Sequence, residues 1–209
     1  MLTELNHDFS VIGLTETKYV ASRSQFINIT IPSYNFDSQP SLSNAGGVGF
    51  FVSDKLSYTI RNDISQVTLD YESLWIEIQS NLHHNRICGV IYRHPKSNLK
   101  TFMNSLNNVM DKINRENKYC IIMGDFNVNL LNSESHLATD EFLSNLGIYF
   151  FNPRILKPTR ITLIDNIFFN SIVHHTISGN IIHDLTDHLP NFLIPHYLYI
   201  NFIEGITPI

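Results

Sequence analysis

Acidic and amide residues flank several short apolar runs of this sequence, and their chemistry suits a hydrolytic site. They are Glu16 after VIGLT, Asp125 and Asn127 after CIIMG, Asp165 and Asn166 after TLI, and Asp187 and His188 before LPNFLI. Taken singly, each is more typical of an ordinary surface turn. Apolar runs become core strands, however, and strand ends open at the rim of a sheet. The whole set therefore predicts a site at such a rim.

These residue types favour phosphoester hydrolysis. Carboxylate and carboxamide oxygens are hard ligands for Mg²⁺, which takes only one or two protein carboxylates and keeps several waters. A carboxylate can orient or deprotonate an attacking water, and a protonated histidine can neutralise charge that develops on phosphoryl oxygens. A neighbouring aspartate can fix the histidine tautomer.

Other hydrolytic motifs are absent from the sequence. It contains no GxxxxGK[ST] loop, which argues against P-loop nucleotide hydrolysis. It contains no GxSxG, no HExxH and no Cys/His metal cluster, which argues against esterase and metalloprotease classes.

Composition indicates one folded domain with little excess charge. The chain has 209 residues, 43% of them hydrophobic and 16% charged, with a formal net charge of -5. A disordered chain shows the opposite combination. Binding to nucleic acid would need local basic patches, because general polyanion binders carry a basic excess.

The expected compartment is intracellular. Cys88 and Cys120 lie far apart within apolar runs, which predicts two buried thiols and no disulfide. The N-terminus carries Glu4, His7 and Asp8 where a signal peptide would be apolar. No run has the length of a membrane span, so a soluble chain without membrane contact is expected.

The elements that would position the site alternate between strands and a few helices. Expected strands are 9–15, 47–52, 73–79, 86–92, YCIIMGDFN, 164–170 and 189–194. The segments 73–79 and 86–92 are expected to form an antiparallel hairpin. An apolar stripe predicts a helix between 99 and 114, and a second helix is expected over 137–146. This order is typical of α+β layers, with sheets packed together and helices outside.

At these residues the sequence resembles the endonuclease/exonuclease/phosphatase (DNase I-like) superfamily. Within it, the sequence is similar to the apurinic-type endonuclease domain of non-LTR retrotransposons. The matching segments are GLTETKY (13–19), NAGGVGFFV (44–52), GVIYRHP (89–95), IIMGDFNVNLL (121–131), KPTRIT (157–162), TLIDNIFFN (162–170) and LTDHLPNF (185–192). The resemblance implies a four-layered sandwich of two packed mixed or antiparallel sheets flanked by helices.

The resemblance also implies a role for each site residue. Glu16 would bind Mg²⁺ (or Mn²⁺ as a substitute), and Asp187 would be a second carboxylate, either near the metal or acting as a base. Asp125 would position or deprotonate the water, assisted by Asn127, which would also contact the phosphate. His188, oriented by Asp165, would stabilise the transition state. Tyr92 would hydrogen-bond a phosphate oxygen, and Arg93 would help to bind the DNA strand. Arg160 is a further basic residue available for the DNA. Gly46, Gly47 and Gly49 would be structural and let a strand pack closely.

The sequence departs from the family pattern in four places. A first strand that carries an asparagine ligand is missing, which predicts a sheet edge or gap beside 9–15. The connection between KPTRIT and LIDNIFFN is short and would tighten or misplace Asp165. Residue 186 is Thr where Ser is usual. The domain is expected to cover 1–194, with 195–209 as a tail outside the resemblance.

Three functions stay open on this reading. The first is a Mg²⁺-dependent endonuclease that nicks DNA, associated with a reverse-transcriptase domain absent from this sequence. The second is a transposon-derived remnant that keeps the fold without turnover. The third is a phosphoesterase of the same superfamily that acts on another substrate, such as a phosphoinositide or sphingomyelin. Nuclear localisation follows only from the resemblance, and the oligomeric state is not predicted.

Overall fold

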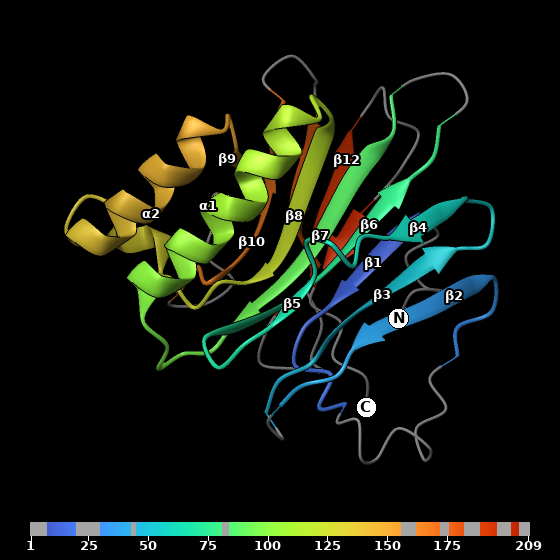
Figure 1. Ribbon diagram of the computed structural model, residues 1–209, viewed down its shortest axis with the longest axis horizontal. Helices are drawn as coiled ribbons and strands as arrows, with labels where there is room; N and C mark the ends of the chain where they lie inside the picture. The colour runs from blue at the N-terminus through green and yellow to red at the C-terminus, as the bar shows by residue number, and fades with distance from the viewer. Residues whose placement is uncertain are drawn as a thin grey trace.

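The computed structural model contains two β-sheets packed face to face, with two helices on one outer side (Figure 1). It describes residues 8–19, 30–42, 45–80, 84–155, 162–171, 176–181, 189–195 and 202–204. The predicted α+β class is confirmed. The helical layer expected outside the other sheet has no counterpart within these residues.

The larger sheet has seven strands in the order β4-β6-β7-β8-β10-β9, with β5 also paired to β6. The strands are β4 Tyr58–Ile60, β5 Gln66–Val67, β6 Tyr71–Ile78, β7 Arg86–Arg93, β8 Tyr119–Asp125, β9 Asn152–Pro153 and β10 Asp165–Phe169. The predicted hairpin is confirmed, because β6 and β7 pair antiparallel along their whole length. β7 and β8 run parallel, so α1 crosses between them.

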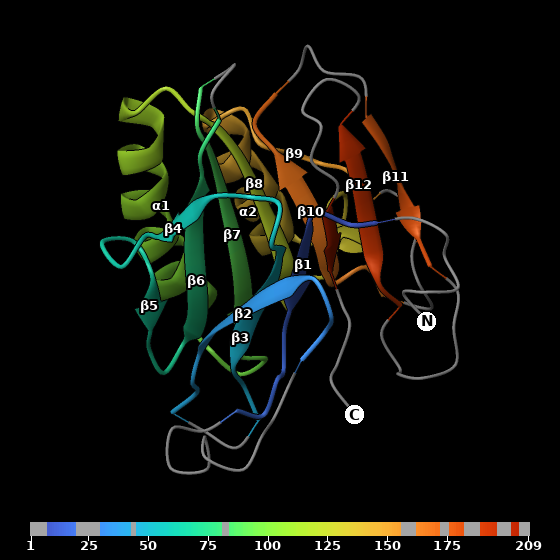
Figure 2. The same cartoon turned by 90° about the vertical axis from the view of Figure 1, so that its right-hand side faces the viewer.

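The smaller sheet has six strands in the order β11-β12-β13-β1-β3-β2. The strands are β1 Val11–Leu14, β2 Tyr34–Gln39, β3 Val48–Ser53, β11 Thr176–Asn180, β12 Asn191–Pro195 and β13 Phe202–Glu204. Figure 2 shows this sheet facing the viewer, with the helices behind the larger sheet.

Both helices cover the outer face of the larger sheet. They are α1 Leu99–Arg115 and α2 Leu137–Ile148, and both were predicted from the sequence. Asn98 caps α1, since its side chain accepts a hydrogen bond from the backbone N of Thr101 at 3.1 Å. The apolar stripe of α1 is buried against the sheet, as the periodicity predicted: Phe102, Leu106, Val109, Met110 and Ile113.

Strand alternation divides the side chains of the larger sheet between two core layers, one on each face. Side chains at even positions of β6, such as Leu74 and Ile76, enter the core between the sheets, whereas Tyr71 and Trp75 belong to the core beneath the helices. The sheets approach closely where Gly13 of β1 faces Met123 of β8: a Cβ on Gly13 would lie 2.5 Å from the Met123 sulfur. Both cysteines are buried free thiols, as predicted.

The prediction of an open edge beside β1 is wrong. β1 pairs antiparallel with β3 on one side and parallel with β13 on the other, in the register Val11–Phe202. β13 also pairs with β12, so the sheet is continuous across this position. The segment expected as a separate tail thus supplies one strand of the sheet. No helix in the described parts of the chain is both long and apolar enough to cross a membrane.

Candidate active site

Four polar side chains form a row across the larger sheet. In register, Glu72 of β6 lies opposite Tyr92 of β7, Tyr92 beside Asp125 of β8, and Asp125 opposite Asp165 of β10. The row lies on the face of the larger sheet that borders the core between the two sheets. Glu72 is two residues from Leu74 on β6, and Tyr92 is two residues from Val90 on β7, so each shares a strand face with a residue of that core. All four residues are at most 3% exposed. We call this row the acidic row.

The smaller sheet brings Glu16 to the acidic row. β1 and β7 run toward the same rim, at the lower side of Figure 1. There the Tyr92 hydroxyl donates a hydrogen bond to Glu16 Oε1 at 2.9 Å. Glu16 is only half-buried, unlike the four residues of the acidic row. The contact joins residues from the two sheets into one candidate site.

The backbone around Glu16 is held in an unusual conformation. Glu16 and Lys18 have φ values of 51° and 54°, a region that non-glycine residues rarely occupy. The backbone N of Thr17 donates to the Gly47 carbonyl at 3.1 Å, and the backbone N of Lys18 donates to the Gly46 carbonyl at 2.8 Å. Such conformations persist where the surrounding structure fixes them, and they concentrate at functional sites.

The turn after β8 fixes Asp125 and Asn127 together. The backbone N of Asn127 donates to Asp125 Oδ1 at 2.8 Å, and its side-chain amide donates to Asp125 Oδ2 at 3.1 Å. Gly124 allows this turn, because its φ is 142° and a Cβ there would lie 1.9 Å from the Ile91 carbonyl oxygen. The GDFN motif therefore encodes a fixed carboxylate with both oxygens hydrogen-bonded.

Tyr92 is an uncharged hydrogen-bond donor at this site. Burial raises the pKa of Tyr92 well above its usual range. The hydrogen bond to Glu16 and the negative charges of Glu16, Asp125 and Glu72 raise this pKa further. A tyrosine in this setting keeps its proton and can donate it in a hydrogen bond to an anionic group.

Arg93 holds the turn after β8 in this structure, and its binding to the DNA strand stays a prediction. It is 5% exposed, and its guanidinium donates to backbone carbonyls: Phe126 at 2.8 Å, Asn127 at 3.1 Å and Ser97 at 3.0 Å. Burial lowers the pKa of Arg93, although the nearby Asp125 acts in the opposite direction. Arg93 therefore clamps the turn that carries Asp125 and Asn127.

The remaining predicted residues divide into two groups. Asn166 does not join the site, because its side chain is buried and pairs with the backbone of Ile155. Arg160, Asp187 and His188 lie outside the described residues, as do Thr186 and the part of the connection before Asp165 up to residue 161. Asp165 itself stays in register with Asp125.

Sequence reasoning missed Glu72 and its neighbour His94. Glu72 is fully buried, and the Nε2 atom of His94 lies 3.5 Å from its Oε1 atom. One signal was available in the sequence: the even-position alternation of Leu74, Ile76 and Ile78, extended by one step, places Glu72 on an apolar face. A carboxylate at such a position requires buried hydrogen-bond donors.

The residues present suit a divalent cation that keeps part of its hydration shell. Glu16 is half-buried and offers a carboxylate with one oxygen hydrogen-bonded to Tyr92. Mg²⁺ needs only one or two such ligands, with waters in the other positions. The described residues contain no group of three or more His, Cys, Asp or Glu side chains arranged as a complete protein cage. This donor set fits Mg²⁺ better than Zn²⁺, which takes nitrogen and sulfur ligands.

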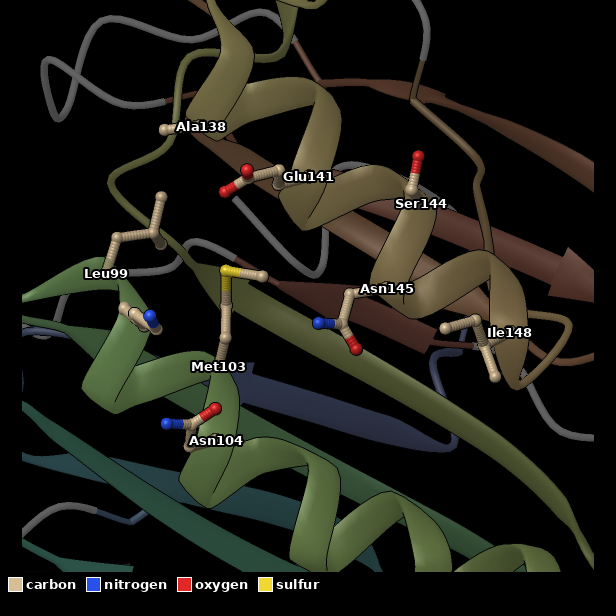
Figure 3. Close-up of a pocket in the computed structure, with 9 residues that line it drawn as sticks. Leu99, Met103, Asn104, Ala138, Glu141, Ser144, Asn145 and Ile148 are labelled. Carbon is tan, nitrogen blue, oxygen red and sulfur yellow. The ribbon is translucent and has the colours of Figure 1, made fainter.

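Two surface hollows lie away from the acidic row. A cavity of about 490 Å³ between α1 and α2 is lined by Leu99, Met103, Glu141 and neighbouring residues (Figure 3). A more polar cavity of about 370 Å³ lies near Tyr119, at the opposite end of β8 from Asp125. The first lies between the helices that cover the outer face of the sheet, whereas the acidic row lies on the inner face.

Solved structures show the same fold at low sequence identity. The catalytic domain of Xenopus laevis APE2 aligns with a TM-score of 0.63 and 14% identity, covering 99% of this chain and 87% of that chain. The endonuclease domain of TRAS1, a telomere-specific non-LTR retrotransposon, aligns with a TM-score of 0.54 and 10% identity, covering 76% and 84%. The 3'-5' exonuclease NExo of Neisseria meningitidis aligns with a TM-score of 0.57 and 11% identity, covering 92% and 91%.

The sequence itself matches one family over most of its length. No curated protein matches it significantly. The Endonuclease/Exonuclease/phosphatase family model matches residues 2–188, a span that contains the acidic row, Glu16 and the turn after β8. The chain therefore belongs to the endonuclease/exonuclease/phosphatase family.

Proposed function

We propose that this protein is a Mg²⁺-dependent endonuclease that hydrolyses one phosphodiester bond of DNA and leaves a nick. The observation that carries the proposal is the contact between Glu16 of one sheet and Tyr92 of the other. It places the carboxylate of a half-buried residue beside a neutral hydroxyl donor and the fixed carboxylate of Asp125. A metal ligand, a phosphate donor and a base are the groups that this reaction needs.

Each residue has a part in the proposed reaction. Glu16 holds Mg²⁺, which when bound supplies positive charge to the phosphoryl oxygens. Asp125, oriented by Asn127, accepts the proton of the attacking water as the new P–O bond forms and the ester P–O bond breaks. Tyr92, whose single hydroxyl proton binds Glu16 in the structure, donates it instead to a phosphate oxygen once DNA is bound. From the resemblance, we assign His188 with Asp165 to charge stabilisation, Asp187 to the metal and Arg160 to the DNA strand.

The experiment uses supercoiled plasmid and the purified chain. Wild type with Mg²⁺ converts the plasmid to open circles, and Asp125→Ala abolishes this product, whereas Asp140→Ala, an exposed aspartate of α2, nicks at the wild-type rate. Equal nicking by wild type and Asp125→Ala would assign the activity to a contaminant and remove the proposal. A folded wild type that never nicks would instead support an inactive remnant.

The proposal includes DNA as the substrate and a retrotransposon as the origin of the protein. The similarity to the TRAS1 endonuclease domain and the retrotransposon-like motifs support DNA as substrate, a retrotransposon origin and a nuclear site of action beside a reverse transcriptase. Release of phosphate from a phosphoinositide, or phosphocholine from sphingomyelin, without nicking of plasmid would transfer the same chemistry to another phosphoester. DNA affinity is expected to fall with salt, because phosphate contacts release counterions.

A further inference from the structure

Glu72 is a fully buried carboxylate with three described partners. Its oxygens accept hydrogen bonds from the Ser41 hydroxyl and from the backbone N of Gly47. The Nε2 atom of His94 lies 3.5 Å from Oε1. Within the residues that the structure describes, no Lys or Arg forms an ion pair with Glu72. A buried carboxylate destabilises the fold unless its oxygens are hydrogen-bonded or paired with a cation.

A backbone route connects Glu72 to Glu16. Glu72 binds the N–H of Gly47, and the carbonyls of Gly46 and Gly47 accept the backbone N–H groups of Lys18 and Thr17. These N–H groups belong to the two residues that follow Glu16 in its strained turn. A Cβ at Gly46 would lie 2.6 Å from Glu72 Oε2, so the glycine pair admits the carboxylate. The conformation of the Glu16 turn thus depends on where Glu72 holds Gly47.

A side-chain route runs in parallel. His94 contacts Glu72, and its ring packs edge-on against Tyr92 with ring centroids 5.1 Å apart and an interplanar angle of 81°. The hydroxyl of Tyr92 in turn donates to Glu16. Glu72 therefore supports both the backbone of Glu16 and the residue that binds its carboxylate.

We propose that Glu72 is a positioning residue that sets the divalent-cation affinity of Glu16 through the Gly46–Gly47 segment and the His94–Tyr92 pair. The proposal rests on the proposed function only in that Glu16 binds the cation. Glu72 itself touches neither metal nor substrate. Outer-shell partners of metal ligands change metal affinity by about 10- to 100-fold when mutated.

The test measures Mn²⁺ binding to the full chain without DNA, by calorimetry or by the electron paramagnetic resonance signal of free Mn²⁺. Glu72→Gln keeps the side-chain shape and removes the charge. It is expected to weaken Mn²⁺ binding by about 10-fold or more. Glu77→Gln is the matched control, because Glu77 lies on the same strand and is 8% exposed, but it pairs with Arg61 and Lys118 at the other end. It should bind Mn²⁺ as wild type does.

A second readout separates positioning from general damage. If Glu72 acts through the metal ligand, then raising Mg²⁺ restores the nicking rate of Glu72→Gln to within a few-fold of wild type. Asp125→Ala should show no such rescue. His94→Gln interrupts only the side-chain route and should weaken Mn²⁺ binding by about 3-fold, a smaller loss than that of an outer-shell carboxylate. This variant decides the question if Glu72→Gln does not fold.

The outcomes distinguish this inference from the proposed function. Wild-type Mn²⁺ affinity in Glu72→Gln, or in His94→Gln where the first variant does not fold, would overturn the positioning role and leave the proposed function intact. A wild-type protein that binds no Mn²⁺ would overturn both. Weaker binding in Glu72→Gln with unchanged Glu77→Gln supports the inference.

Discussion

Buried acidic residues at the two ends of the larger sheet have different kinds of partners. Glu77, near the end of β6, joins a network with the cations Arg61, Lys112 and Lys118. The other carboxylates of this network are Asp63 and Glu116, so three cations meet three anions. Glu72, at the start of the same strand, is bound by a hydroxyl, a backbone N–H and a histidine.

The two ends differ in what balances the negative charge: Lys and Arg side chains at one end, and hydrogen-bond donors with a histidine at the other. Hydrogen bonding to Arg61 lowers the pKa of Glu116 to about 2, against the opposing effect of burial. Burial alone would raise the pKa of Glu77, but hydrogen bonds from Lys118 and Asn85 outweigh it and lower the pKa. At this ion-pair end, the positive and negative charges balance. In the described residues, Glu16 has no ion pair with Lys or Arg, so a divalent cation would supply the missing positive charge.

The largest expected effect on activity is at Glu16. Glu16→Gln should lower Mg²⁺-dependent nicking by more than about 100-fold, because it removes the metal-binding charge itself rather than an outer-shell partner. The unfolding free energy should change by less than about 1 kcal/mol, since the side chain is half-buried and retains a hydrogen-bond acceptor. Nicking assays and urea denaturation give the two values, with exposed Glu141→Gln as the control. Full activity in Glu16→Gln would contradict the division between the two ends.

The ion-pair end should show the reverse pattern. Arg61→Ala removes the cation that binds Asp63, Glu77 and Glu116, and should lower the unfolding free energy by about 2–3 kcal/mol. Mn²⁺ binding should stay at the wild-type value. Urea denaturation and calorimetry measure both, and Arg115→Ala, an exposed arginine of α1, is the matched control. A loss of Mn²⁺ binding in folded Arg61→Ala would show that the ends are coupled.

Tyr92→Phe removes one hydrogen bond from the link between the sheets. We expect the nicking rate to fall by about 10-fold, which corresponds to about 1.4 kcal/mol of lost transition-state stabilisation. The unfolding free energy should fall by about 1 kcal/mol, the usual value for one hydrogen bond. Single-turnover kinetics and thermal denaturation provide the comparison. An unchanged rate would mean that the hydroxyl only supports the fold.

The smallest expected effect is the acid dependence of the ion-pair end. Because the pKa of Glu116 is about 2 in the folded chain and near 4.5 in the unfolded chain, the unfolded state binds more protons between these values. This contribution is complete above pH 4.5 and is lost as the pH falls toward 2. We expect a decrease of about 1 kcal/mol after solvent screening. Urea denaturation at successive pH values should show a shallower decrease in Glu116→Gln, and identical slopes would contradict the ion-pair assignment.

The sequence predicted the central strands and both helices because their apolar periods are strong. It missed β2 and β11, which form the two edges of the smaller sheet and have the mixed sequences YNFDSQ and TISGN. Edge strands are only half-covered, so their side chains need not alternate between apolar and polar. β13 was also missed, because pairing between segments so distant in sequence leaves no local signal.

The positions of site residues could be predicted where they follow from the end of an apolar strand. They could not be predicted where a side chain is held by contacts with the backbone. Strand-end positions place Asp125 opposite Asp165 and beside Tyr92, which contacts Glu16. The intramolecular contacts of Arg93 were not predicted, because its partners are carbonyl oxygens of a turn, which no side-chain pattern reveals. Glu72 was missed because a single carboxylate within an otherwise apolar strand does not by itself indicate a site.

The place of β13 has a consequence for how the chain is made. β13 is synthesised long after β1, yet it is one of the two strand partners of β1. Bringing such distant segments together costs loop-closure entropy and slows folding. A ribosome-bound nascent chain would therefore hold β1 with an unpaired, apolar edge until β13 emerges. During that interval the unpaired strand edge would be open to aggregation.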